Sequence, residues 1–333
     1  RGLKNPPEAL YTTEDALKTA GLLHPVGYHE DFEPAPGIKV TYYDAGHILG
    51  SGSLRLEVTE DDKTTSIIFS GDIGRPQALI VRDPESPPKA DYIFMESTYG
   101  DRNHKNEDIS DQELADAIAY SYSKGEKVII PAFAVERTQE ILYCLHILQS
   151  KGKLPADMPV FVDSPLAIRA TEVFRRNREL FDEDAQKMLH QGDDPFELPN
   201  LRYTLDAAES QSINEYKGPA IIISASGMCN AGRVRHHLKH NIWRPGASIV
   251  FVGYQAVGTP GRKIVEKASK ITLFGAIYLG IVAICPLLLG KAVGNAYLAI
   301  GGTSVIIVVG VALETVKALE AQMLMRQYKG FLE

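Results

Sequence analysis

Three short clusters between residues 43 and 100 carry side chains that could bind a metal ion or transfer a proton. They are Asp44-Ala-Gly-His47-Ile-Leu-Gly-Ser51, Phe69-Ser-Gly-Asp72-Ile-Gly-Arg75 and Phe94-Met-Glu96-Ser-Thr-Tyr99-Gly100. Imidazole and carboxylate groups are zinc ligands, and a catalytic zinc site takes at least three ligands from the protein. His47 and Asp72 could therefore form half of such a site. The same residues are also typical of a hydrogen-bonded loop histidine and an Asx turn, so spacing alone leaves both interpretations open.

Each cluster follows an apolar run that is typical of a β-strand. These three runs and one more, at 53–58, predict four strands, at residues 38–43, 53–58, 66–70 and 91–95. We expect the last two to be buried and the strand at 53–58 to be half exposed. Gly71 and Gly74 allow a tight turn that directs Asp72 out of a strand end. The proline-rich residues 32–37 are predicted to form a loop.

Helices and strands alternate in the following part of the chain. Helices are predicted at 108–124 and 136–150, and buried strands at 127–130, 159–162 and 220–223. Such alternation is typical of a parallel sheet that helices cover on both faces. We therefore expect an α/β domain here.

Two strand-to-helix turns of this domain could bind phosphate. Arg137 lies in the first turn of a predicted helix, where its planar guanidinium could hold a phosphate group. Ser224-Ala-Ser-Gly-Met228 follows a strand and precedes a helix expected from about residue 232, so backbone N–H groups could face an anion. A glycine turn and a surface arginine explain the same pattern without a ligand. The next helix carries His236 and His237, for which the sequence leaves two roles open, packing and catalysis.

Composition limits the function classes. With 333 residues the chain can form two domains, and its net charge of −7 excludes a broad cationic surface for nucleic acid. Cys144, Cys229 and Cys285 have neither disulfide nor metal spacing, which favours a reducing compartment.

The C-terminal part differs in composition from the rest. Residues 271–289 and 296–313 contain no charged side chain, and each run can cross a hydrocarbon core of about 30 Å as a helix. Basic residues flank the pair on both outer sides, which predicts a membrane hairpin with both ends in the cytoplasm. A buried helix of a soluble domain is the alternative.

The three clusters, Pro131-Ala-Phe-Ala-Val-Glu-Arg137-Thr-Gln-Glu140, the turn at 224–228, and Gly253-Tyr-Gln255 with Gly258-Thr259 follow the order seen in one enzyme group. To about Val265, the chain resembles the metallo-β-lactamase-fold nucleases of the β-CASP group. The resemblance implies a partial metallo-β-lactamase αββα sandwich with an inserted β-CASP α/β domain. It also implies zinc-dependent hydrolysis of phosphodiester bonds in single-stranded RNA, with two zinc ions in the complete family.

The resemblance assigns roles to particular residues. His47 matches a zinc ligand, Asp72 matches the carboxylate that bridges two zinc ions, and Glu96 matches an acidic residue beside the metal. Asp72 and Glu96 are thus the expected catalytic residues. The expected RNA-binding residues are Arg137, Ser226, Gly227 and Met228. His104 has a family counterpart but is also typical of a solvated loop.

Two family features are missing from this sequence. The His-x-His-x-Asp-His motif and the later histidines do not occur, and the chain begins at Arg1, as a fragment would. We therefore expect weak zinc binding and no activity from this chain alone.

The last residues resemble a different family. Residues 266–333 resemble the last two transmembrane helices and cytosolic tail of SecY, the protein-translocation channel, which implies a membrane and Sec subunits as partners. The resemblances divide the chain into a partial metallo-β-lactamase domain (1–105), a β-CASP domain (106–245), a return strand to the first domain (246–265) and this hairpin (266–333). A chimeric reading frame would explain the join. A SecY fragment and a non-catalytic RNA-binding module are the alternative functions.

Overall fold

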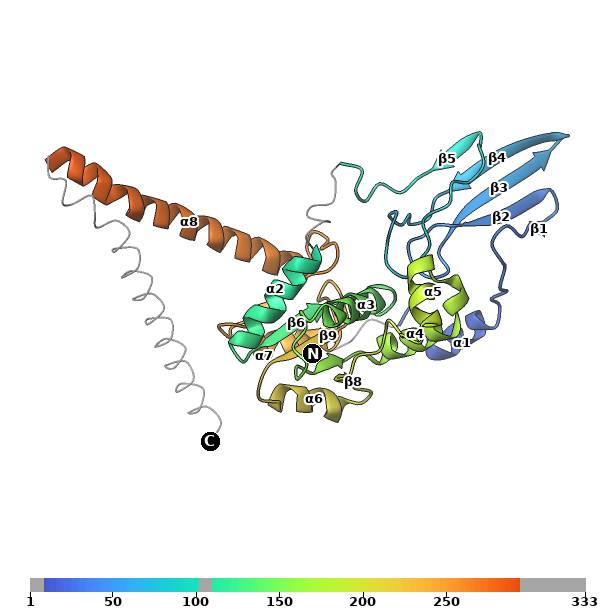
Figure 1. Cartoon of the computed structure of the whole chain (residues 1–333). Helices are drawn as coiled ribbons and strands as arrows, with labels where there is room; N and C mark the ends of the chain where they lie inside the picture. Colours follow the sequence, from blue (N-terminus) through green and yellow to red (C-terminus); the bar gives the residue numbers. More distant parts are fainter. Residues whose placement is uncertain (1–8, 102–109, 294–333) are drawn as a thin grey trace. The chain divides into compact units, whose positions relative to one another are not determined.

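The computed structural model describes residues 9–101 and 110–293. The chain divides into two compact units, Arg1–Tyr254 and Gln255–Glu333. In its described part the first unit contains two sheets, which succeed one another along the chain (Figure 1). A short helix, α1 (Thr13–Ala20), precedes them and is capped by the side chain of Thr12.

The first sheet has the strand order β1-β2-β3-β4-β5. Its strands are β1 (Phe32–Ala35), β2 (Ile38–Asp44), β3 (Gly52–Glu60), β4 (Lys63–Phe69) and β5 (Tyr92–Phe94). The first four are antiparallel neighbours, whereas β5 pairs parallel to β4. Strands β2, β4 and β5 therefore run in the same direction and end at the same edge of the sheet. The three clusters follow these three strands.

Both edge strands of this sheet differ from the sequence prediction. The predicted loop at 32–37 contains β1, and Pro34 is tolerated there because an edge strand leaves some N–H positions unpaired. Strand β5 was expected to be buried, yet Tyr92, Ile93 and Phe94 are 57–61% exposed. Successive side chains of a strand point to opposite faces of the sheet, so the described residues leave both faces of β5 largely uncovered.

The second sheet confirms the predicted parallel α/β arrangement. Its strands pair in parallel in the order β10-β6-β9-β7-β8. They are β6 (Lys127–Pro131), β7 (Val160–Val162), β8 (Leu201–Tyr203), β9 (Ala220–Ser224) and β10 (Ser248–Ile249). The helices are α2 (Ser110–Ser123), α3 (Arg137–Ser150), α4 (Pro165–Arg176), the 3-10 helix η2 (Arg178–Leu180), α5 (Glu183–His190), α6 (Ala207–Glu215) and α7 (Val234–Asn241).

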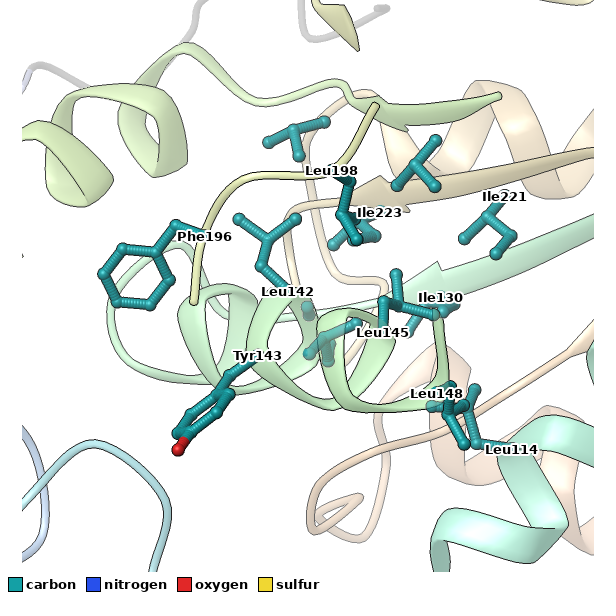
Figure 2. Packing of buried hydrophobic residues seen from close by; sticks show 14 of the residues in the cluster. Leu114, Ile130, Leu142, Tyr143, Leu145, Leu148, Phe196, Leu198, Ile221 and Ile223 are labelled. Carbon is teal, nitrogen blue, oxygen red and sulfur yellow. The ribbon is translucent and has the colours of Figure 1, made fainter. Parts of the chain in front are cut away.

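The main core lies between this sheet and its helices. Every residue of β6, β7 and β9 is buried, as expected for strands covered on both faces. Figure 2 shows Leu142 and Leu145 of α3 packed near Ile130 and Ile223 of the central strands, and Leu148 beside Leu114 of α2. Each such side chain stabilises the fold by about 1.5–3 kcal/mol when fully buried. The helical spacing in the sequence therefore predicted the buried face of α3.

The end of the first unit differs from the predicted return strand at 246–265. Ser248–Ile249 pairs with β6 of the second sheet, and Val250 N donates to Ile129 O at 2.9 Å. The side chain of Ser248 also lies 2.8 Å from Ser121 Oγ of α2. These contacts hold this short strand at the edge of the second sheet rather than the first.

The second unit contains α8 (Pro260–Val293), which includes the first predicted membrane span. Within residues 9–101 and 110–293, no helix is long and apolar enough to cross a membrane. The second predicted span, 296–313, lies outside the described residues. The predicted membrane hairpin, its topology and its Sec partners are therefore not supported.

Candidate functional site

Hydrogen bonds join the three loops that follow β2, β4 and β5. Gly74 N donates to Ala45 O at 2.8 Å, which links the first two loops. Ile73 N donates to Glu96 Oε1 at 2.7 Å, and Glu96 N donates to Ser70 Oγ at 3.0 Å. The strand ends therefore form one connected edge.

The candidate catalytic and metal-binding side chains belong to this edge. His47 and Asp72 are exposed, and Glu96 is half-buried. Burial raises the pKa of the Glu96 carboxyl, but hydrogen bonds from Ile73 and Thr98 and the charge of His47 outweigh burial, so this pKa lies below its usual value. Glu96 is thus within electrostatic reach of His47 and favours the carboxylate form.

Gly74 permits the close contact between the first two loops. A Cβ atom at this position would lie 1.6 Å from Gly46 O and 2.7 Å from His47 N. No other amino acid fits there unless the backbone moves. Gly74, two residues after Asp72, therefore allows this loop to lie close to the His47 loop.

The zinc ions that the family resemblance implies would need a complete set of protein ligands at this edge. His47 and Asp72 offer nitrogen and oxygen donors of the right kind, but zinc needs at least three protein ligands. One oxygen of Glu96 already accepts the Ile73 N–H. Among the residues that the structure describes, no group of three or more His, Cys, Asp or Glu could hold a metal ion. These residues do not complete a zinc site.

Arg137 begins α3, as the sequence predicted. Its Nη1 lies 2.5 Å from Glu140 Oε2, and its side chain is 39% exposed. The ion pair fixes the guanidinium on the first turn of the helix and leaves part of it open to solvent. The neighbouring Glu136 accepts a hydrogen bond from Leu49 N at 2.9 Å, which connects this helix start to the His47 loop.

The turn at 226–228 differs in one respect from the prediction. Helix α7 begins at Val234, close to the predicted start at about residue 232, and the difference concerns the Ser226 N–H. Ser226 N donates to Ala231 O at 3.2 Å within the same loop, and is therefore not directed at a ligand. A Cβ at Gly227 would lie 2.9 Å from the ring of Phe133, in the loop that leads into α3. The turn with its half-buried Met228 thus lies beside the start of α3.

Sequence reasoning missed Asp163, which is fully buried at the end of β7. Its carboxylate accepts from Arg233 Nη1 at 2.8 Å, Thr204 Oγ1 at 2.6 Å and Ser210 Oγ at 2.7 Å, and lies 2.6 Å from His237 Nε2. Burial raises its pKa, but these hydrogen bonds hold the pKa well below the usual range. An aspartate directly after a strand of a parallel sheet was the signal that could have found it.

The same cluster contains His237, one of the two histidines left open by the sequence. His237 is fully buried, and its Nδ1 has no hydrogen-bond partner. A ring nitrogen enclosed in this way cannot reach a substrate, so His237 packs inside the domain. His236 is exposed, and His104 lies outside the described residues.

Comparison with known proteins identifies the domain around the second sheet. A family model described as Beta-Casp domain matches residues 138–264. This part of the chain is therefore similar to the Beta-Casp domain family. A second family model, described as SecY, matches residues 247–316, so the two matches overlap between β10 and α8.

Similar proteins extend the likeness beyond the Beta-Casp domain. The chain is 34% identical over 273 residues to "Ribonuclease TTHA0252" of Thermus thermophilus. The aligned region covers 82% of this chain and 62% of that protein. The chain is 35% identical over 270 residues to "RNase J-like protein" of Methanocaldococcus jannaschii, covering 79% and 60%. It is 32% identical over 271 residues to "Transcription termination factor FttA" of Methanosarcina mazei, covering 80% and 42%. The chain thus spans less than two thirds of each relative.

Proposed function

We propose that this chain is part of an RNA-processing nuclease of the Beta-Casp type, which hydrolyses phosphodiester bonds in single-stranded RNA. The observation that carries the proposal is the connected edge at which His47, Asp72 and Glu96 follow three strands that end together. The similarity to proteins named ribonuclease supports the same reaction class.

In this proposal, side chains of the edge do the chemistry and the Beta-Casp domain binds RNA. His47 and Asp72 supply two of the ligands of a zinc site, and Asp72 and Glu96 are the catalytic groups. The half-exposed guanidinium of Arg137 contacts the phosphate backbone, and so does the turn formed by Ser226, Gly227 and Met228, through groups other than the Ser226 N–H. Because the net charge is −7, RNA is bound through these local groups rather than through a broad cationic surface.

The incomplete ligand set favours a second candidate, an RNA-binding module without hydrolysis. Two zinc ligands are fewer than a catalytic site requires. If the chain is such a module, it binds zinc weakly and leaves RNA uncleaved. Elemental analysis of the purified chain, beside His47→Ala and Asp72→Ala, separates the candidates. Near two zinc ions per chain, lost in both variants, supports the nuclease; a zinc content near zero supports the module.

RNA binding tests the feature common to both candidates. Arg137→Ala should weaken binding of a short 5′-phosphorylated single-stranded RNA about tenfold, because it removes charge-assisted hydrogen bonds to phosphate. Arg176→Ala is the matched control, since it removes the same charge from an exposed position at the end of α4. Equal affinities of the two variants would contradict the assignment of Arg137.

A further inference from the structure

Glu136, directly before Arg137, has a strained backbone. Its φ is 65° and its ψ is −64°, and Arg137 N donates to Val135 O at 2.9 Å across it. This combination is a γ-turn of the positive-φ type, which is rare and strained. A residue other than glycine keeps such a backbone conformation only where its surroundings hold it. Such positions cluster at functional sites.

The side chain of Glu136 explains what holds the turn. The residue occupies the N-cap position of α3, but its carboxylate makes no capping hydrogen bond. Instead, the side chain is buried and Oε2 accepts from Leu49 N at 2.9 Å. The γ-turn therefore directs the carboxylate away from its own helix and toward the loop after β2.

Leu49 is a second point, besides Ala45, at which the His47 loop is bound from outside. The N–H groups of His47 and Ile48 donate to Ser51 Oγ within the loop, at 3.0 and 3.2 Å. The N–H of Leu49 donates to Glu136, 87 residues further along the chain. One hydrogen bond thus connects the loop of the candidate metal ligand to the residue that precedes the candidate RNA contact.

We propose that Glu136 is a positioning residue that anchors the His47 loop to the start of α3 and so fixes His47 relative to Arg137. The inference rests on the proposed function for the roles of His47 and Arg137. It explains why a glutamate, rather than glycine, occupies a conformation that glycine adopts with less strain. Phosphate bound at Arg137 then lies at a constant distance from the strand-end edge.

Two variants of Glu136 test the anchor. Glu136→Gly relieves the backbone strain and removes the carboxylate, whereas Glu136→Gln keeps an oxygen that can accept the Leu49 N–H. We expect Glu136→Gly to weaken binding of a short 5′-phosphorylated single-stranded RNA about fivefold, and Glu136→Gln to bind within about twofold of the parent. Asp62→Gly, which relieves a positive φ of 60° in the β3–β4 turn, is the matched control and should bind like the parent. Parent-like binding by Glu136→Gly would overturn the role in RNA binding.

Hydrogen exchange of the full chain without RNA provides a second readout. The Leu49 amide should exchange at least tenfold faster in Glu136→Gly than in the parent, and at nearly the parent rate in Glu136→Gln. The amides of β6 should stay protected in all variants, which shows that the fold is intact. Unchanged Leu49 exchange in Glu136→Gly would refute the anchor whatever the RNA result. Failure of the parent to bind RNA would refute the proposed function, and the exchange rates would still decide the anchor.

Discussion

Two buried carboxyl groups of the first unit have opposite electrostatic surroundings. Burial raises the pKa of Glu136 to about 8, and the negative charge of Glu140 adds to this rise; the hydrogen bond from Leu49 N–H and the charge of Arg137 offset only part of it. Asp163 is equally buried, but charged and hydroxyl donors surround it and hold its pKa low. The two residues should therefore respond to pH in opposite directions.

Glu136 should make the protein less stable as the pH rises. Its pKa is about 8 when folded and 4.5 in an unperturbed chain, so between these values the folded state binds the extra proton. The stabilisation is complete below the unfolded value and is lost as the pH rises through the folded one. Glu136→Gln should remove this pH dependence, which amounts to about 5 kcal/mol in the free energy of unfolding between the two pKa values. Urea unfolding at several pH values measures it, and parallel curves for parent and variant would refute it.

Asp163 should stabilise the protein at neutral pH and lose that effect in acid. Because its folded pKa lies below its usual value of 3.8, the stabilisation is present above that value and is lost as the pH falls below it. Asp163→Asn should lower the free energy of unfolding by about 3 kcal/mol at neutral pH, since it leaves the Arg233 charge without its partner. Asp184→Asn, at an exposed position, is the control and should change it by less than about 0.5 kcal/mol. Similar losses in both variants would contradict the assignment.

At the scale of elements, the position of each strand in its sheet decides what its residues can do. In the second sheet, β6 and β9 have a strand on either side, and their residues form the core. In the first sheet, β5 is an edge strand with exposed apolar side chains, and Phe94 stacks on Phe69 at 4.9 Å between ring centroids. Such an edge can pair with another chain.

Ile93→Lys tests the edge strand. Ile93 is 57% exposed, so the change should alter the free energy of unfolding by less than about 0.5 kcal/mol. It should also reduce self-association in sedimentation velocity, because a lysine on an edge strand opposes pairing. Ile68, its register partner on β4, is 6% exposed, and Ile68→Lys should unfold the sheet. If Ile93→Lys destabilises as much as Ile68→Lys, β5 is covered in solution.

At the scale of the whole molecule, the chain divides after Tyr254. The candidate site residues His47, Asp72, Glu96 and Arg137 and the turn at 226–228 all belong to the first unit. The SecY match lies mostly in the second unit. The side chains named in the proposed function therefore all lie in the first unit.

A chain that ends at Tyr254 should keep the RNA affinity of the full chain. Its thermal unfolding midpoint should also equal that of the full chain, because the residues of the core cluster all precede residue 254. Fluorescence anisotropy with the same single-stranded RNA and thermal unfolding measure the two quantities. Loss of cooperative unfolding in the shortened chain would show that the first unit needs residues beyond 254.

Local pattern in the sequence was sufficient for much of the fold and part of the site. The helical spacing of Ile141, Leu142, Leu145 and Leu148 predicted the buried face of α3, and strand runs followed by glycines placed His47, Asp72 and Glu96 at strand ends. These features depend on neighbours within a few residues, so the sequence displays them directly.

Contacts between distant segments were decided by the tertiary structure. The Glu136–Leu49 hydrogen bond joins residues 87 positions apart, and the Asp163–His237 contact joins residues 74 apart. In neither pair does the local sequence around one residue predict its contact with the other. The exposure of β5 likewise depends on what packs beside it, and the apolar run alone predicted burial. Local conformation follows from neighbouring side chains, whereas burial, pairing and shifted pKa values depend on which remote groups share the same space.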